Sequence, residues 1–258
     1  MIPKTIFYLF GLDKAFCNKP FEYFHYLNIL SAKKINFDYT INLYYYHRPN
    51  SIWFNKLESE SICNLIKLDS LNVEVDDKKL AYTEHLSDIL RLKLVNKYGG
   101  IYLDIDTICI KPFDSLLNRQ FVMGVEGANI GEGGSNVLVG LCNAVLISEV
   151  NSKFTNIWIE DYKNNYQVDW NYNSIKRPLQ LSYEYPELIH VESQSSFFKY
   201  SWEEHGKNAM FNSNSDISDC FSLHLWEHKN YLHLVKYNRE YILHNNDTVS
   251  NLYKKLIE

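Results

Sequence analysis

The sequence lacks several features that would assign it to zinc-binding, disulfide-stabilised or membrane-spanning proteins. Its five cysteines are widely spaced and include no Cys-x-x-Cys pair, so neither a zinc site nor a disulfide framework is indicated. No apolar run reaches the roughly 18 residues that cross a bilayer. The opening segment is too short and too close to Lys4 and Asp13 to form a signal peptide. We therefore expect a reduced, cytoplasmic protein without a transmembrane segment.

Positive charge is also scarce. The chain has 26 Lys and Arg against 31 Asp and Glu, a formal net charge of −5, which argues against general binding to nucleic acid or to an anionic membrane. Its 258 residues can bury a sizeable core and fit one large domain, with or without a subdomain. Aromatic residues reach 15%, including 20 Tyr. Most of them suit core packing, although exposed rings also stack on sugars and bases.

The N-terminal third alternates between strand and helix signals. Residues 6–10 form a short apolar run that ends at Gly11, and residues 39–46 alternate and are rich in β-formers. Residues 21–32 between them have helical character. This order predicts a parallel sheet of the α/β class. Two further elements are expected, a helix within residues 51–68 and a short strand at 71–75.

The next helix, at residues 83–97, has apolar residues around much of its circumference and should be substantially buried. It carries Asp88 and Arg91, three positions apart. Buried charges need partners. The possible partners of Asp88 and Arg91 are each other, the backbone or a polar ligand. Gly99 and Gly100 then provide the stop that ends the helix.

Two carboxylates follow directly after a buried strand at residues 101–103. Asp104 and Asp106 stand at its carboxyl end, where open α/β sheets place their ligands. Carboxylates one residue apart can hold a hard divalent cation, Mg²⁺ or Mn²⁺, and so grip a diphosphate. The later chain is expected to contain extended chain at 108–113, a turn at 114–117, a loop with six glycines at 124–140, a strand at 143–148, a helix at 154–164 and mixed short elements over 166–258.

Together these residues resemble the DXD-containing sugar transferases of glycosyltransferase family 32. That group includes α-mannosyltransferases, α-1,4-galactosyl- and N-acetylglucosaminyltransferases and, distantly, the clostridial glucosylating toxins. Its pattern is Ser-Asp-x-x-Arg followed by Gly-Gly-x-Tyr-x-Asp-x-Asp. The pattern stands here as Ser87-Asp88-Ile89-Leu90-Arg91 and Gly99-Gly100-Ile101-Tyr102-Leu103-Asp104-Ile105-Asp106, with weaker matches at Ile2-Pro3-Lys4, Lys111-Pro112-Phe113, Asn143-Ala144 and Leu223-His224-Leu225-Trp226.

The resemblance implies a GT-A fold, in which a Rossmann-like mixed sheet flanked by helices binds a nucleotide sugar and a C-terminal region closes over it. A single domain over residues 1–258 is expected, with residues 1–150 binding the donor and residues 151–258 forming the acceptor and lid region. The expected reaction is metal-dependent transfer, with retention of configuration, of a hexose or N-acetylhexosamine. The donor is a UDP-sugar rather than a GDP-sugar, and the acceptor is a glycan or another hydroxyl.

The resemblance also implies roles for individual residues. Asp88 and Arg91 would bind donor sugar hydroxyls and orient the diphosphate. Asp104 and Asp106 would hold Mn²⁺ or Mg²⁺, with His224 as a further ligand and Asp104 also near the donor. The remaining expected donor contacts are Asn143, Trp226 at the leaving phosphate, and Phe10 or Tyr8, which would stack on the base because the family's His and Trp after the first strand are replaced here by Phe7 and Phe10.

Two alternatives stay open at this point. Leu103-Asp104-Ile105-Asp106-Thr107 also looks like the nucleophile strand of haloacid-dehalogenase-type phosphatases, in which the first Asp attacks phosphorus. That strand should open its fold rather than follow about 100 residues, so the position of Asp104 argues against it. The other alternative is a catalytically silent module that binds a sugar or nucleotide.

Overall fold

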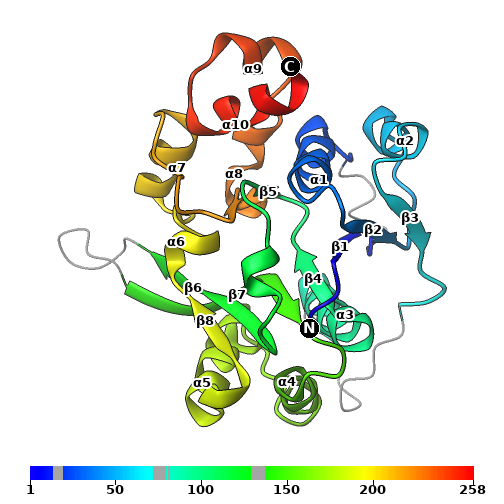
Figure 1. Cartoon of the computed structure of the whole chain (residues 1–258), viewed down its shortest axis with the longest axis vertical. Helices are drawn as coiled ribbons and strands as arrows, with labels where there is room; N and C mark the ends of the chain where they lie inside the picture. Colours follow the sequence, from blue (N-terminus) through cyan, green and yellow to red (C-terminus); the bar gives the residue numbers. More distant parts are fainter. Residues whose placement is uncertain (14–19, 72–79, 81, 129–136) are drawn as a thin grey trace.

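The chain is built around a seven-stranded mixed sheet with helices on both faces (Figure 1). The computed structural model describes residues 1–13, 20–71, 80, 82–128 and 137–258. The strand order is β3-β2-β1-β4-β7-β6-β8, and β5 and β9 form a separate two-stranded sheet. The strands are β1 (Thr5–Phe10), β2 (Thr40–Tyr45), β3 (Asn64–Lys67), β4 (Gly100–Leu103), β5 (Thr107–Cys109), β6 (Phe121–Ala128), β7 (Val137–Ser148), β8 (His190–Glu192) and β9 (Ser222–His224).

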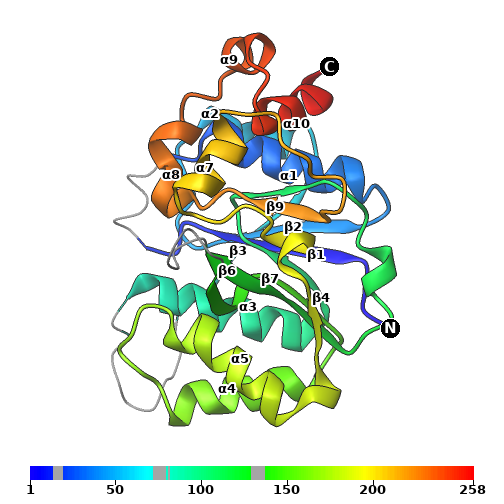
Figure 2. The same ribbon diagram turned by 90° about the vertical axis from the view of Figure 1, so that its left-hand side faces the viewer.

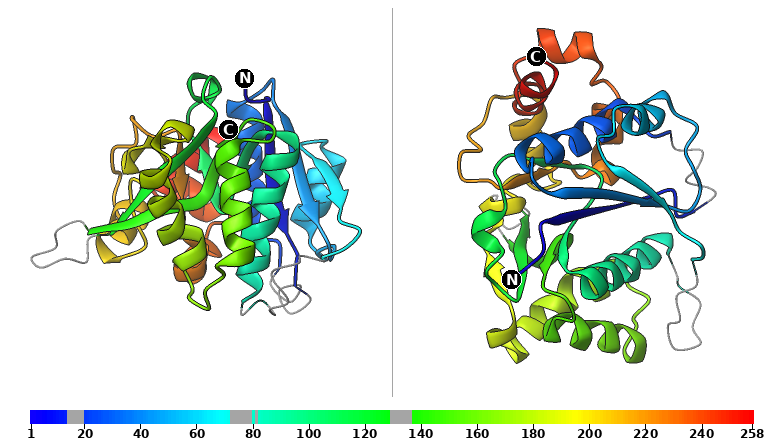
Figure 3. Two further views of the ribbon diagram at one scale, coloured as in Figure 1. Left: turned by 90° about the horizontal axis from the view of Figure 1, so that it is seen from below. Right: turned by 45° about the vertical axis from the view of Figure 1, so that its right-hand side comes forward.

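The helices divide between the two faces of the large sheet (Figure 2). Helices α3, α4 and α5 cover one face, and α3 and α4 run side by side there (Figure 3). Helices α1 and α2 and the C-terminal helices α7 to α10 lie on the other side. The helices are α1 (Tyr23–Ile35), α2 (Ile52–Ser59), α3 (Thr83–Tyr98), α4 (Lys153–Asn164), α5 (Arg177–Glu184), α6 (Gln194–Phe197), α7 (Glu204–Phe211), α8 (Glu227–Leu234), α9 (Arg239–His244) and α10 (Thr248–Ile257).

The predicted strand, helix and strand near the N-terminus are confirmed as β1, α1 and β2. Strand β1 pairs in parallel with β2, where Ile6 faces Ile41, and with β4, where Ile6 faces Ile101. Strand β4 then pairs antiparallel with β7. The sheet is therefore mixed and flanked by helices, as the α/β prediction requires.

Alternation along β1 supplies a hydrophobic layer on each side of the sheet. Ile6 and Tyr8 pack into the layer that includes α1 and α10, whereas Phe7 and Leu9 pack into the layer that includes α3 and α4. Successive side chains of a strand point to opposite faces, so one apolar run can serve both layers. The carboxyl edge of this central strand is thereby held from both sides.

The helix expected within residues 51–68 is confirmed as α2. Helix α2 begins after Ser51, whose hydroxyl accepts a hydrogen bond from the backbone N–H of Trp53, and it ends at Ser59. The chain then turns through Ser61, which has a φ of 51°. A left-handed residue interrupts a right-handed helix, and the remaining residues form β3.

The prediction of a glycine-rich loop over residues 124–140 is wrong at both ends of this range. Strand β6 continues to Ala128 and β7 begins at Val137. Gly124 lies within β6 because a neighbour fills the space of a side chain: a Cβ there would lie 2.6 Å from Cδ2 of Phe197. Residues 129–136, and most of the strand expected at 71–75, lie outside the described residues.

The predicted glycine stop after α3 is confirmed. Gly99 has φ 64° and ψ 171°, a backbone region open essentially to glycine alone. A Cβ at this position would also lie 2.7 Å from Cδ of Pro3. The stop lets the chain reverse directly from α3 into β4.

We expect Gly99→Ala to lower the free energy of unfolding by about 2–3 kcal/mol, because alanine must adopt the strained backbone and meet Pro3. Urea denaturation followed by circular dichroism measures this change. Lys93→Ala, on the exposed side of α3, is the matched control and should change stability by less than about 0.5 kcal/mol. Equal stability of the two variants would contradict the assignment.

The C-terminal third consists mainly of short helices, as the expectation of mixed short elements suggests. In the ranges that the structure describes, every helix is too short or too polar to cross a bilayer.

Candidate functional site

Asp104 and Asp106 lie in a turn between β4 and β5. The backbone N–H of Asp104 donates to the carbonyl oxygen of Ala144 on β7 at 2.8 Å, and the N–H of Thr107 donates to the carbonyl oxygen of Asp104 at 3.0 Å. These bonds end β4 against its neighbour and close the turn. Both carboxylates consequently stand at the carboxyl end of a buried strand, the position predicted from the sequence.

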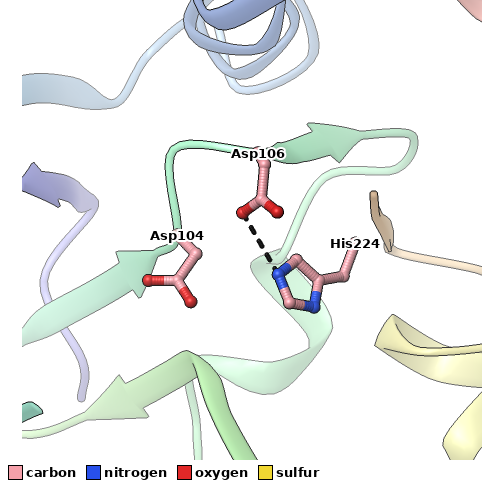
Figure 4. Close-up of side chains that lie close together, drawn as sticks. All are labelled: Asp104, Asp106 and His224. Atoms are coloured by element: carbon pink, nitrogen blue, oxygen red, sulfur yellow. Dashed lines mark hydrogen bonds and ion pairs between the residues drawn. The ribbon is translucent and has the colours of Figure 1, made fainter. Parts of the chain in front are cut away.

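A histidine from the C-terminal third joins the two carboxylates. Strand β9 pairs antiparallel with β5, which places His224 opposite Thr107. Nε2 of His224 lies 3.1 Å from Oδ1 of Asp106 (Figure 4). One ligand atom from each of Asp104, Asp106 and His224 lies within 4.8 Å of the other two. Two carboxylates and an imidazole form a donor set that divalent metal ions accept.

The charges of Asp106 and His224 stabilise each other. Burial disfavours an ionised Asp106, but His224 and the backbone N–H of Glu227, 2.6 Å from Oδ2, lower its pKa to about 2. Burial likewise opposes protonation of His224, but the negative charge of Asp106 outweighs it and raises the histidine pKa. A cation that binds here therefore competes with a proton on His224.

Trp226 has an unusual backbone at the edge of this cluster. Its φ of 54° and ψ of 53° place a bulky residue in the left-handed region. Its indole N–H donates to the carbonyl oxygen of Tyr200 at 2.8 Å, and its ring centroid lies 4.3 Å from that of His224. The residue immediately after it is Glu227, whose N–H binds Asp106. Strained backbone of this kind often occurs at functional sites.

Helix α3 brings Asp88 and Arg91 to the same edge of the sheet, each only 6% exposed. Nη2 of Arg91 lies 3.4 Å from Oδ1 of Asp88, and Nη1 lies 3.1 Å from Oδ1 of Asp104. Nη1 also donates to the side-chain and backbone oxygens of Asn143, at 3.0 and 3.1 Å. The amide of Asn143 in turn donates to Asp88 at 2.7 Å. The two buried charges thus find partners in each other, in the backbone and in neighbouring side chains.

This network also orients Asp104. The hydroxyl of Tyr102 donates to its Oδ1 at 2.7 Å, and the guanidinium of Arg91 lies over the Tyr102 ring, 4.7 Å from its centroid. Burial opposes the charge on Arg91, but Asp104, Tyr102 and Asp88 raise its pKa. The side chain of Asp104 remains 24% exposed, so it can still reach a ligand.

These residues line one cavity of about 530 Å³, a volume typical of sites for small ligands. Phe10 lies on its β1 side, and Glu126, Trp202 and Trp170 also border it. Of the residues predicted to act, the cavity brings together Phe10, Asp88, Arg91, Asp104, Asp106, Asn143, His224 and Trp226.

Comparisons with known proteins agree with this geometry. Residues 22–122 match the family described as the glycosyltransferase sugar-binding region containing a DXD motif. Along its whole length the chain is 29% identical to glucan organizing enzyme 1 of Cryptococcus neoformans and covers 71% of that protein. It is 25% identical to human alpha-1,4-N-acetylglucosaminyltransferase over 66% of this chain and 48% of the relative. The chain is a glycosyltransferase.

The fold of this glycosyltransferase is also found in a solved structure. The glycosyltransferase GlyE of Streptococcus pneumoniae aligns with a TM-score of 0.53 at 12% identity, over 99% of this chain and 60% of the other. The GT-A fold that the resemblance implies is confirmed.

The phosphatase alternative for Asp104 does not survive these findings. The family match covers the segment that holds Asp104 and Asp106. In the transferase, Asp104 follows β4, and within the described residues β1, β2 and β3 come before it. A phosphatase nucleophile was expected to open its fold, so this strand is not one.

Tyr8, the alternative to Phe10 for stacking on the base, does not line the cavity. Tyr8 is fully buried in the middle of β1, within the core of the transferase, and is not among the residues lining the cavity. Phe10 ends the same strand and does line the cavity. Its ring is held edge-on by Phe21 and His25, at centroid distances of 5.0 and 5.3 Å. Only the strand end reaches the ligand edge of the sheet.

The cavity residues that sequence reasoning did not identify include Glu126, Trp170 and Trp202. Glu126 lies inside the segment for which the number of glycines predicts a loop. The β-forming run of Phe121–Ala128 was the signal that could have identified a strand there. Nothing in their local sequence distinguishes Trp170 and Trp202 from other aromatic residues.

Proposed function

We propose that this enzyme transfers a hexose or N-acetylhexosamine from a UDP-sugar to a hydroxyl of a glycan, with metal dependence and retention of configuration. The observation that carries the proposal is the cluster of Asp104, Asp106 and His224 beside Asp88 and Arg91 in one cavity. The cluster suits a cation bound to a diphosphate, and Asp88 and Arg91 suit the hydroxyls of a sugar.

The residues present fit a divalent cation. Asp104, Asp106 and His224 would hold Mn²⁺ or Mg²⁺, and the exposed part of the Asp104 side chain leaves room for a shared ligand. The cation would supply positive charge that stabilises the departing diphosphate. Arg91 adds a positive charge 3.1 Å from Oδ1 of Asp104, and Asp106 is kept ionised by its hydrogen bonds and by His224.

Donor binding is proposed to run along the carboxyl edge of the sheet. Phe10 would stack on the base, and Asp88, Arg91 and Asn143 would contact the sugar and orient the diphosphate. Trp226 would approach the leaving phosphate. The name of the human relative supports an N-acetylhexosamine donor among the candidates. We assign donor binding to residues 1–150, and the acceptor and closing region to residues 151–258.

Front-face attack accounts for retention. The acceptor oxygen bonds to the anomeric carbon while the bond from that carbon to the diphosphate oxygen breaks. The electron pair leaves with the diphosphate, which also takes up the proton of the acceptor hydroxyl. The chain's own residues contribute by orienting the two substrates and by excluding water from the buried edge of the cavity.

A donor panel read by thermal unfolding tests the proposal. We expect a UDP-sugar with Mn²⁺ to raise the midpoint by roughly 5–10 °C at 100 times its Kd, since such binding adds about 2.7 kcal/mol to stability. UDP-glucose, UDP-galactose, UDP-N-acetylglucosamine and GDP-mannose are compared with Mn²⁺, Mg²⁺ or EDTA. An equal rise in EDTA would contradict metal dependence, and a larger rise with GDP-mannose would contradict the UDP preference.

A further inference from the structure

Glu126 is a buried carboxylate for which neither the family pattern nor the donor site accounts. It lies on β6, is 6% exposed and lines the cavity. Its Oε2 has no hydrogen-bond partner among the described residues. Leaving a buried polar atom unpaired is costly. The terminal torsion of glutamate rotates easily, so either oxygen can turn toward the cavity.

The sheet order places Glu126 at the end of the site away from the base. Phe10 ends β1, Asp104 follows β4, Asn143 lies on β7 and Glu126 lies on β6. These strands are consecutive neighbours in the sheet. Three steps of about 4.8 Å separate β1 from β6 by roughly 14 Å. A donor with its base at Phe10 and its diphosphate at Asp104 would therefore place its sugar between Asp104 and Glu126, and an acceptor that approaches this sugar from the β6 end would lie against Glu126.

The surroundings of Glu126 suit a sugar rather than a metal ion. The half-buried Trp202 borders the cavity with it, and aromatic rings stack on sugar faces. Burial raises the pKa of Glu126, although the charge of His224 and hydrogen bonds to Cys142 and Trp202 oppose the shift. Among the described residues, the metal-holding group consists of Asp104, Asp106 and His224 and does not include Glu126.

We propose that Glu126 is an acceptor-binding residue whose carboxylate accepts a hydrogen bond from a hydroxyl of a sugar acceptor, with Trp202 stacking on that sugar. The inference rests on the proposed transferase function and deepens it. It assigns the acceptor to the β6 end of the cavity, so residues 1–150 would contribute one acceptor contact in addition to the donor site.

Glu126→Gln tests the role because it keeps the shape of the side chain and removes its charge. The probes are p-nitrophenyl glycosides of glucose, galactose, mannose and N-acetylglucosamine, with the best donor of the panel and Mn²⁺. We expect kcat/KM for transfer to fall about 100-fold. Donor hydrolysis by water and the donor-induced rise in melting temperature should stay within about 2-fold and about 1 °C of the parent enzyme. Glu187→Gln, an exposed position with the same charge change, is the control and should transfer normally.

A second variant guards against a general loss of structure. Glu126→Asp keeps the carboxylate but withdraws it by one methylene group, so transfer should recover to within about 10-fold of the parent enzyme, with the remaining loss in the KM for the glycoside.

Three results would overturn the assignment. The first is unchanged transfer by Glu126→Gln. The second is a loss of donor hydrolysis and of donor-induced stabilisation in this variant as large as its loss of transfer. The third is a hexose mass found on Glu126 after incubation with donor alone, which would make Glu126 a nucleophile. If the parent enzyme glycosylates none of the glycosides, the assignment of a glycan acceptor is overturned. A parent enzyme that binds no nucleotide sugar would instead contradict the proposed function.

Discussion

Replacing Asp106 by asparagine is expected to lower transfer at least about 1,000-fold while leaving the fold intact. The asparagine oxygen can still accept the hydrogen bond from the N–H of Glu227, so the turn into α8 should survive. The variant loses the negative charge that pairs with His224 and that would bind the cation. Metal assistance is worth several kcal/mol, and each 1.4 kcal/mol changes a rate about 10-fold.

The loss is measured as kcat for donor hydrolysis and transfer, together with the Mn²⁺-dependent rise in melting temperature. The rise should disappear, whereas the melting temperature without metal should fall only by the loss of the buried pair with His224. Asp38→Asn removes a carboxylate from an exposed ion pair with Lys4 and serves as the control. Mn²⁺-dependent stabilisation of the Asp106 variant equal to that of the parent enzyme would exclude Asp106 as a metal ligand.

The second large effect is expected at Arg91. Its guanidinium contacts Asp88, Asp104 and Asn143 at once. A lysine ammonium is a point charge and cannot reproduce this planar fork. Arg91→Lys should therefore lower transfer more than about 100-fold, because the donor-binding groups lose their fixed orientation. Arg91→Ala should in addition lower the free energy of unfolding by about 3–5 kcal/mol, since it leaves buried carboxylates without their cation.

Arg177 provides a matched comparison. It also holds a carboxylate with two donors, Nε and Nη2, both bonded to Asp161 at 2.9 and 2.7 Å. It lies on α5 and does not line the cavity. Arg177→Lys should keep full transfer activity even if stability falls. If Arg91→Lys and Arg177→Lys lose activity in parallel, Arg91 acts only through stability and not through donor binding.

Much of the candidate site could be predicted because it lies in one continuous segment. The apolar surface of α3, the glycine stop and the short buried β4 are local signals, and together they place Asp104 and Asp106 at a strand end. The same signals showed that Asp88 and Arg91 would be buried and would need partners. They did not select the partners, because Asn143 lies 52 residues beyond Arg91 and meets it through the pairing of β4 with β7.

Other features of the candidate site depend on contacts between residues that are far apart in the sequence. Tyr8 and Phe10 stand two positions apart on β1 and therefore on the same face of the sheet. Only the packing of the strand shows that Tyr8 is enclosed while Phe10 reaches the cavity. The position of Glu126 on a strand beside the cavity could not be predicted, because the number of glycines around it indicates a loop. In the structure, Gly124 is instead required by the close approach of Phe197 to β6.

The sequence by itself determined the α/β class, the helix, stop and strand around the DXD pair and, through resemblance, the kind of chemistry, because periodicity and turn residues act over short distances. The tertiary structure decided what surrounds the pair. His224 lies 118 residues from Asp106 and reaches it only because β9 pairs with β5. Strand pairing and layer packing are long-range free energies, so they alone brought His224 to the two carboxylates and Glu126 to the cavity.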